Sequence, residues 1–167
     1  MSVYKEPLEW IKESIDSILN QTFRDFEFII VDDNPEDDNL LGTLKEYERK
    51  DNRIHILRNE FNIGLTKSLN LALRSAQGEF IARMDADDIS CLDRFQIQYS
   101  YMILHPEVDV CGAFYETIGD VSFLSSKIGK MPTHDADIKD LMLFNNPMVH
   151  PVSFYKNSIK GKKVFYN

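Results

Sequence analysis

The sequence predicts an α/β protein in which a mostly parallel sheet is covered by helices on both faces. Short apolar segments that are typical of buried strands alternate with amphipathic segments of helical spacing. This alternation is the pattern of strand–helix–strand units with parallel strands. The chain has 167 residues, the length of one domain of ordinary size. We therefore expect a single domain built around one sheet.

The individual elements follow from the spacing of the apolar residues. Residues 8–19 carry apolar side chains at helical spacing behind Pro7, and residues 26–31 form a nearly uninterrupted apolar run that stops at Asp32. Gly78 is expected to end the third helix as a left-handed cap. The further elements expected are helices at 40–47, 65–76, 94–104 and 138–144, and strands at 54–57, 80–84, 108–114 and 152–155.

Composition and charge exclude several classes of protein. The formal net charge of −8 argues against nucleic acid as a partner, because phosphate backbones are bound by clusters of Lys and Arg. No apolar run approaches the roughly 20 residues that span a bilayer, and no signal peptide is visible. Cys91 and Cys111 are too few for a disulfide framework and are expected to be reduced thiols. We therefore expect a cytoplasmic protein.

The acidic segment 85–88 follows a predicted buried strand directly. Its sequence, Asp85-Ala86-Asp87-Asp88, brings carboxylates close together, and a close pair repels by about 1 kcal/mol in water and about 4 kcal/mol at an effective dielectric of 20. A hard divalent cation such as Mg²⁺ or Mn²⁺ would relieve this repulsion and would also bind substrate phosphates. Helix capping by Asp88 or Asp93 within a solvated loop is the alternative. The residues alone leave both explanations open.

A second acidic segment, residues 32–39, also follows a predicted strand. A calcium loop of the EF-hand type is excluded, because its sixth position is Asp37 and its twelfth is Thr43, where Gly and Glu are required. A strand exit, a turn and an N-cap at Asp38 or Asn39 account for the second half of the segment, but less well for its first two aspartates. The carboxyl ends of parallel strands share one edge of a sheet, so we expect both acidic segments there.

Four segments, taken with their order and spacing, resemble a known family. They are residues 17–23 (Ser-Ile-Leu-Asn-Gln-Thr-Phe), 26–33, 62–65 (Asn-Ile-Gly-Leu) and 78–88. The pattern resembles family 2 glycosyltransferases of the GT-A fold, which is a Rossmann-like α/β fold. The resemblance is strong over residues 2–110 and weakens toward residue 155. Each segment alone is weakly specific, whereas the four together are specific.

The resemblance implies roles for the acidic residues. Asp32 and Asp33 resemble the strand-end motif that holds the nucleobase or ribose of a nucleotide-sugar donor, with Asp32 expected at the base. The Asp85-Ala86-Asp87 segment resembles the DxD motif of the family. Asp85 would lie toward the ribose and the metal, and Asp87 would coordinate a Mn²⁺ or Mg²⁺ ion that bridges the diphosphate.

The same resemblance gives expectations for further residues. Ser2 and Tyr4 lie where the family's first strand ends, and Tyr4 would line the base pocket. Lys67, near the start of the third predicted helix, would touch nucleotide or phosphate, although a solvated lysine explains it as well. Arg83 is either a phosphate contact or a structural ion pair with the acidic loop.

The chain departs from the family pattern at both ends. Only residues 1–4 remain of a first strand that is central in the family's sheet, so we expect an incomplete N-terminal strand, a gap in the sheet and reduced stability. The catalytic base is expected beyond Asn167, so no catalytic residue is assigned. Residues 1–167 would form a single partial GT-A domain, with a nucleotide-sugar-binding half at 1–110 and the start of an acceptor-side half at 111–167. On its own this domain is expected to be inactive.

The implied activity is metal-dependent transfer of a hexose from a nucleotide-diphosphate sugar, with a UDP-sugar favoured, to a polysaccharide or a lipid-linked glycan. The family usually inverts the anomeric centre, and the cation stabilises the charge on the departing nucleoside diphosphate. Peripheral association of the full-length parent with the inner face of the membrane belongs to the same expectation. Two alternatives stay open: a catalytically silent nucleotide-sugar-binding module, and a receiver-like signalling domain whose aspartates bind Mg²⁺.

Overall fold

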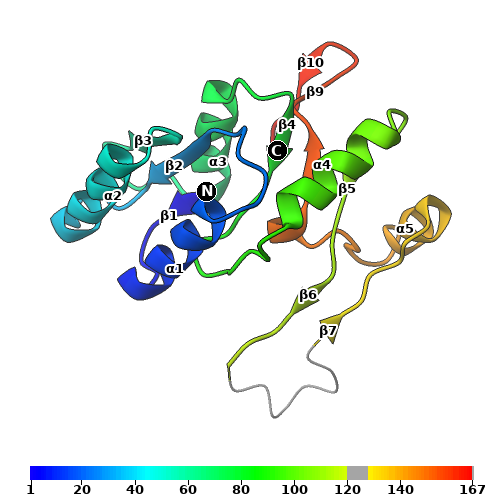
Figure 1. The fold of residues 1–167 in the computed structure, drawn as a ribbon, viewed down its shortest axis with the longest axis horizontal. Coiled ribbons are helices and arrows are strands. Elements are labelled where there is room, and N and C mark those ends of the chain that lie inside the picture. Colours follow the sequence, from blue (N-terminus) through cyan, green and yellow to red (C-terminus); the bar gives the residue numbers. More distant parts are fainter. Residues whose placement is uncertain (120–127, 167) are drawn as a thin grey trace.

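The computed structural model describes residues 1–119 and 128–166, which form a mixed α/β structure with two main sheets (Figure 1). The first sheet has the order β1-β2-β3, with β1 at Ser2–Val3, β2 at Phe28–Asp32 and β3 at Ile54–Arg58. The second has the order β4-β8-β5, with β4 at Phe80–Ala82, β8 at Phe154–Lys156 and β5 at Val110–Cys111. The helices are α1 (Leu8–Leu19), α2 (Asp38–Lys50), α3 (Leu65–Ser75), α4 (Arg94–Leu104) and α5 (Asp135–Leu141).

Short elements complete the fold. Two small antiparallel pairs join β6 (Tyr115–Glu116) to β7 (Ile128–Gly129) and β9 (Ser158–Ile159) to β10 (Lys162–Lys163). A single 3₁₀ turn, η1 (His150–Val152), precedes β8. All these elements belong to the second half of the chain, where regular structure is sparse.

The first sheet is parallel, as the sequence predicts, and its core comes from α1, α2 and the strands. Every residue of β2 is buried, and it pairs in parallel with β1 on one side and β3 on the other. The buried side chains of one core cluster include Ile11, Ile15 and Ile18 of α1 and Leu40 and Leu44 of α2. Helix α3 also packs on β1 and β2, but its buried Leu69 and Leu73 lie outside that cluster. Helices therefore cover the sheet from both sides.

The second sheet is antiparallel, which the strand–helix alternation did not predict. Strand β4 pairs with β8, with Ile81 opposite Tyr155, and β5 pairs with the other edge of β8. Strand β4 therefore lies at the edge of its own sheet and has no partner in the first one. The pairing brings together residues more than seventy positions apart, and local periodicity carries no information about such partners.

A gap separates the two sheets, as expected from the short first strand. β1 contributes only two residue pairs to β2, at Val31 and Asp32, so the beginning of β2 has no neighbour on that side. A cavity of about 840 Å³ lies here, lined among others by Phe28 and Ile29 of β2 and by all three residues of β4. The amino group of Met1 is buried at this place and donates to the Ile29 carbonyl oxygen at 2.9 Å. Burial, reinforced by the charge of Arg83, lowers the pKa of this amino group to about 5.

Two predicted helix caps are wrong. Gly78 does not have a positive φ; helix α3 ends at Ser75, with Ala76 as an extended C-cap. The left-handed glycine is instead Gly64, with a φ of 83°, at the start of α3. The N-cap of α2 is Asp37, whose side chain accepts from the Leu40 N–H, so neither of the two residues after it has that role.

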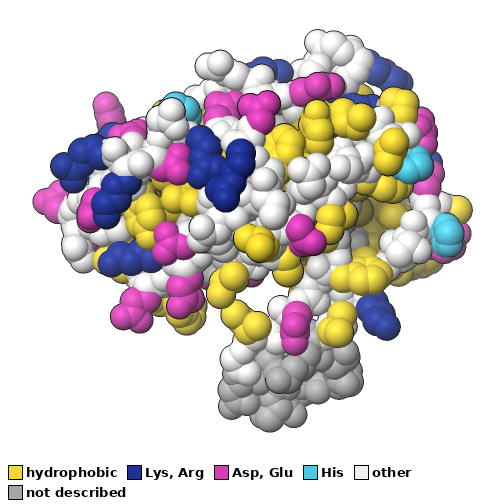
Figure 2. Space-filling view, in the orientation of Figure 1, with side chains coloured by type: hydrophobic (Ala, Val, Ile, Leu, Met, Phe, Trp, Pro, Cys, Tyr) yellow, Lys and Arg dark blue, Asp and Glu magenta, His cyan; other side chains and the backbone are white. Residues whose placement is uncertain are grey.

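The surface differs strongly between α2 and α4 (Figure 2). Helix α2 carries the ion pairs Lys45–Glu48 and Lys50–Glu46, which are typical of a solvated helix face. Helix α4 exposes Ile97, Tyr101 and Leu104 instead.

Cys91 and Cys111 are both free. Among the residues that the structure describes, no helix is long and apolar enough to cross a membrane.

Candidate functional site

Asp32 ends β2 with a fully buried carboxylate. Its Oδ1 accepts from the Asn34 N–H at 3.0 Å, which makes a tight turn directly after the strand. Its Oδ2 lies 3.3 Å from Nε of Arg58 but has no hydrogen-bond partner in the described part of the chain. Burial raises the pKa of Asp32, while the Asn34 N–H and the Arg58 charge act in the opposite direction. Oδ2 of Asp32 is thus paired in charge with Arg58 but accepts no hydrogen bond from the described residues.

Asp33, the next residue, has a different environment. Its Oδ1 accepts from Nδ2 of Asn59 at 2.7 Å and from the Ile63 N–H at 2.9 Å. Its Oδ2 accepts from the Gly64 N–H at 3.0 Å. The Asn59 amide also donates to the buried hydroxyl of Ser68 in α3. Asp33 therefore ties the loop between β3 and α3 to the end of β2.

The other residues expected near the nucleotide lie on neighbouring elements. The Asp33 N–H donates to the Val3 carbonyl oxygen at 2.9 Å, so Tyr4, which follows, lies beside the ends of β1 and β2. Ser2 is half-buried within β1. Lys67 is exposed in the first turn of α3, close in sequence to the Gly64 that Asp33 holds. The structure thus gathers these residues around the carboxyl ends of β1 and β2.

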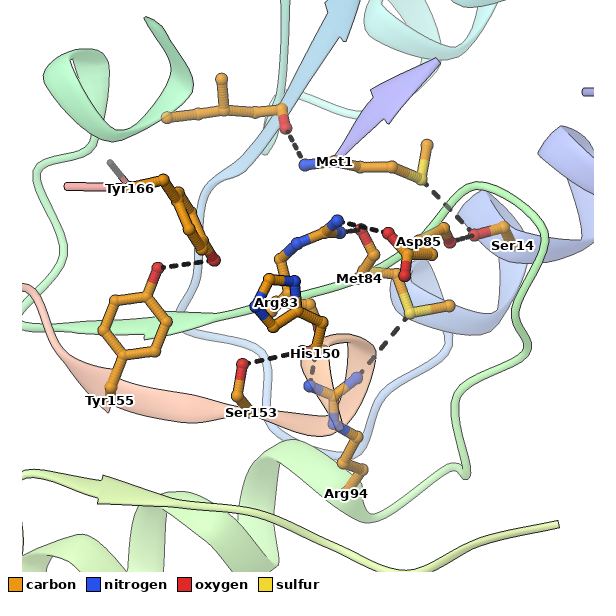
Figure 3. Close-up of polar contacts among 11 residues, drawn as sticks. Met1, Ser14, Arg83, Met84, Asp85, Arg94, His150, Ser153, Tyr155 and Tyr166 are labelled. Carbon is orange, nitrogen blue, oxygen red and sulfur yellow. Dashed lines mark hydrogen bonds and ion pairs between the residues drawn. The ribbon is translucent and has the colours of Figure 1, made fainter. Parts of the chain in front are cut away.

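The acidic loop after β4 begins with an ion pair. The Arg83 guanidinium, which is almost fully buried, pairs with Asp85 and donates to the Met84 carbonyl oxygen (Figure 3). Of the two roles considered for Arg83, the structure therefore shows the ion pair. Asp87 is exposed, and its carboxylate has no hydrogen bond or ion pair within the described residues. Asp88 is half-buried, and its pKa is raised by burial and by the charges of Asp85 and Asp87.

Arg94 fixes the end of β4 from the side of α4. Its Nη2 donates to the Arg83 carbonyl oxygen at 2.7 Å, and its Nε donates to Oε1 of Gln98 at 3.0 Å. Gln98 in turn donates to the carbonyl oxygens of Gly112 and Val152. Burial lowers the pKa of Arg94 to about 10, so it remains a cation at neutral pH. A charged, buried side chain thus links the acidic loop to α4 and the second sheet.

The two acidic segments follow strands of different sheets, β2 and β4, so the expectation that they share one edge of a sheet is wrong. Each is hydrogen-bonded to a different element near the start of the chain. For the first segment, the β1 residue Val3 accepts from the Asp33 N–H. For the second segment, the Ser14 hydroxyl of α1 donates to the Asp85 carbonyl oxygen at 2.9 Å and lies 3.4 Å from Sδ of Met1 (Figure 3). No hydrogen bond or ion pair joins Asp32 to Asp87 in the part of the chain that the structure describes. The cavity between the sheets is lined by neither of them.

The described residues contain no preformed metal centre. Within 1–119 and 128–166, no group of three or more His, Cys, Asp or Glu side chains is arranged to hold a metal ion. This arrangement still fits a cation of the Mg²⁺ or Mn²⁺ type, because such ions commonly take one or two carboxylates and complete their shell with water and substrate phosphates. Asp87 is exposed and has no hydrogen bond or ion pair within the described residues, so its carboxylate is available for this purpose.

Arg58 and Asn59 were not among the residues that the sequence suggested. Both follow from the topology: β3 is the neighbour of β2, and the register places Arg58 opposite Asp32. The signal that could have found them is the end of the next parallel strand, since neighbouring strands end at the same edge. Arg58 also donates to the Pro35 carbonyl oxygen at 2.6 Å and thereby covers the turn after β2.

The fold is that of a GT-A glycosyltransferase. The profile of the family described as "Glycosyl transferase family 2" matches residues 1–156, so the chain belongs to this family. A receiver-like signalling domain is not supported by this match.

Curated relatives agree with the family. The chain is 36% identical over 162 residues to an uncharacterized glycosyltransferase of Methanocaldococcus jannaschii, covering 97% of this chain and 56% of the relative. It is 34% identical to the O-antigen biosynthesis glycosyltransferase WbnJ of Escherichia coli, covering 95% and 61%. It is 30% identical to an Escherichia coli glucosyltransferase, WfgD, whose name specifies UDP-Glc and a GlcNAc-diphosphoundecaprenol, covering 86% and 58%. The chain therefore spans only about three fifths of these relatives.

Solved structures show the same fold. A mannosyltransferase from Pyrobaculum calidifontis, in complex with GDP-Man and Mn²⁺, superimposes with a TM-score of 0.66 at 17% identity. The match covers 93% of this chain and 43% of that protein. The likeness confirms the GT-A fold that the sequence motifs predict.

Proposed function

We propose that this chain binds the donor of a glycosyl transfer, a nucleotide-diphosphate sugar, between the carboxyl end of β2 and the acidic loop after β4. The observation that carries this proposal is Oδ2 of Asp32, which is buried and accepts no hydrogen bond within the described residues. A buried acceptor without a donor is costly, and a ligand N–H would satisfy it. In nucleotides, uracil, thymine and guanine each keep a ring N–H next to a carbonyl group, whereas adenine and cytosine have only exocyclic amino groups as donors.

The same proposal assigns the remaining candidates. Tyr4 lines the base pocket beside Ser2, and Asp33 acts on the nucleotide through the loop that it holds. Lys67 faces the nucleotide from the first turn of α3. Asp85 lies toward the ribose and shares its charge with Arg83. These roles complete the nucleotide-sugar-binding half proposed for residues 1–110.

Asp87, together with Asp85, would hold the divalent cation, Mn²⁺ or Mg²⁺. When bound, such an ion supplies positive charge to the diphosphate as the sugar–phosphate bond breaks. The chain's own contribution is the fixed loop that presents Asp87, an exposed carboxylate without competing protein partners. The structural relative solved with GDP-Man and Mn²⁺ supports a divalent ion at this kind of site.

The whole protein would be an inverting hexosyltransferase that acts on a polysaccharide or lipid-linked glycan. The names of the O-antigen and diphosphoundecaprenol-dependent relatives support this acceptor class. The UDP-Glc in the name of the latter supports a UDP-sugar as donor. The catalytic base and most of the acceptor site would lie outside residues 1–167. Release of free sugar from the donor by the whole protein would distinguish a transferase from a module that only binds the donor.

Calorimetric titration of the 167-residue chain with UDP, GDP, dTDP, CDP and ADP in the presence of Mn²⁺ tests the proposal. We expect UDP, GDP or dTDP to bind more tightly than CDP and ADP, because only the first three offer the ring N–H. Asp87→Ala should weaken binding with Mn²⁺ at least about tenfold and leave metal-free binding unchanged. Asp93→Ala is the matched control, since Asp93 is exposed near the end of the same loop and makes no capping hydrogen bond. Equal binding by Asp87→Ala and the parent chain would contradict the metal assignment.

A further inference from the structure

The segment 17–23 has no role in the site described above, although it is one of the four that resemble the family. It covers the end of α1 and the residues after it. Gln21, just beyond the helix, has a fully buried side chain. A buried primary amide is stable only when its donors and acceptor find partners, so its contacts identify what it holds.

Gln21 is bonded to the second half of the acidic loop. Its Nε2 donates to the Cys91 carbonyl oxygen at 2.7 Å and lies 3.3 Å from the Ser90 hydroxyl and 3.1 Å from the Ser17 carbonyl oxygen. Its Oε1 accepts from the Phe95 N–H at 3.0 Å, in the first turn of α4. One side chain therefore joins α1, the loop after β4 and the start of α4.

Two serines on the same face of α1 hold the rest of the loop. Ser14 and Ser17 are spaced by three residues, which places them on one side of α1, and Gln21 follows just beyond the end of the helix. The Ser14 hydroxyl donates to the Asp85 carbonyl oxygen at 2.9 Å (Figure 3), and the Ser17 hydroxyl accepts from the Ser90 N–H at 3.0 Å. The loop is thus fixed at its first residue, in its middle and at its junction with α4.

The anchored residues of the loop lie on both sides of Asp87 in the sequence. Asp87 lies between Asp85 and Ser90, the residues held by the two serines, and its own side chain has no hydrogen bond or ion pair in the described chain. Its position is therefore set by the backbone around it. The loop also carries neighbouring negative charges that repel each other, so without the anchors it would spread.

We propose that Gln21, assisted by Ser14 and Ser17, is a positioning residue that holds the loop 85–95 in the conformation in which Asp87 meets a divalent cation and a diphosphate. This inference rests on the proposed function. Gln21 touches neither the cation nor the nucleotide; it acts through the backbone of the loop. Residues that orient metal ligands in this way affect metal affinity by about 10- to 100-fold when they are replaced.

The test compares Gln21→Leu with a matched buried amide. Asn157 is also buried and also donates to backbone carbonyl oxygens, those of Ala76 and Gly78, but these precede β4 and lie at its other end. Asn157→Leu therefore removes a buried amide and its two hydrogen bonds to backbone carbonyl oxygens without touching the acidic loop. Both variants of the 167-residue chain are titrated with Mn²⁺ in the presence of UDP, followed by electron paramagnetic resonance of the ion, and with UDP alone.

We expect Gln21→Leu to lower Mn²⁺ affinity about tenfold or more and to change the resonance line shape of the bound ion, with metal-free UDP affinity unchanged. Asn157→Leu should match the parent chain in all three. Parent-like Mn²⁺ binding by Gln21→Leu, or equal losses in both variants, would overturn the proposal. If Gln21→Leu does not fold, Ser14→Ala, which removes one anchor, is tested in its place. Parent-like Mn²⁺ affinity of Ser14→Ala would then overturn the proposal. A parent-like Asp87→Ala would instead point to failure of the metal assignment itself.

Discussion

Asp33 offers a prediction whose size can be worked out from its hydrogen bonds. Asp33→Asn keeps the shape of the side chain but replaces one carboxylate oxygen by an NH₂ group, which cannot accept. The Gly64 N–H then loses its acceptor, or else the Asn59 and Ile63 donors lose theirs. A buried donor left without a partner costs about 1–3 kcal/mol, and hydrogen bonds to a charged acceptor weaken when the charge is removed.

We therefore expect Asp33→Asn to lower the free energy of unfolding by about 2–4 kcal/mol. The lower part of this range applies if water reaches the half-buried Gly64. Urea denaturation followed by circular dichroism measures the change, on the assumption that unfolding is two-state. Asp38→Asn is the control, because the Asp38 carboxylate is 97% exposed and its ion pair with Arg58 spans 3.7 Å.

Two results would refute this reasoning. A loss below about 1 kcal/mol for Asp33→Asn would mean that the carboxylate does not anchor the loop before α3. A loss of the same size in Asp38→Asn would mean that negative charge near the end of β2, rather than the hydrogen bonds, is responsible. The Asp33 variant should also bind UDP more weakly, because the loop that it holds borders the nucleotide in the proposed site.

Two further predictions concern other buried charges. A carboxyl group whose pKa is raised by folding contributes stability that is present below its unfolded pKa and is lost as the pH rises through its folded pKa. Asp32 is such a group, because folding raises its pKa above the ordinary value of 3.8. Asp32→Asn removes this titration, so the difference in free energy of unfolding between the variant and the parent chain, measured in urea titrations, should shift in favour of the variant from pH 3 to pH 7. The variant should also bind UDP more weakly. A difference that does not change with pH would contradict this. Arg94→Lys keeps a cation but cannot reach both the Arg83 carbonyl oxygen and Gln98, and we expect a loss of about 1–3 kcal/mol in the same assay. An unchanged free energy of unfolding would show that one of these bonds suffices.

Local pattern was enough to locate most elements of the fold. The apolar run after Asp25 and the helical spacing of residues 8–19 predicted β2 and α1, which the structure has at Phe28–Asp32 and Leu8–Leu19. Both depend on neighbouring residues only, through side-chain alternation or a 3.6-residue period. The family motifs were also readable, because they consist of short segments in a fixed order, and the family assignment is confirmed.

Pairing between strands that are distant in the sequence could not be predicted from local pattern. The antiparallel pairing of β4 with β8 joins residues 80–82 to 154–156, and no local spacing specifies it. The helix caps went wrong for a related reason: Gly64 rather than Gly78 adopts the left-handed conformation, since the loop that Asp33 holds requires it.

The sequence by itself determined that this chain is an α/β glycosyltransferase domain with carboxylates at the ends of two strands. Only the tertiary structure decided which of those carboxylates already accept hydrogen bonds from the protein itself. Asp33 accepts hydrogen bonds from a loop about thirty residues further along the chain, whereas Oδ2 of Asp32 accepts none within the described residues. The physical reason is that a carboxylate's role depends on the donors around it. In this chain those donors are brought close by strand pairing and helix packing, at sequence separations that no local pattern records.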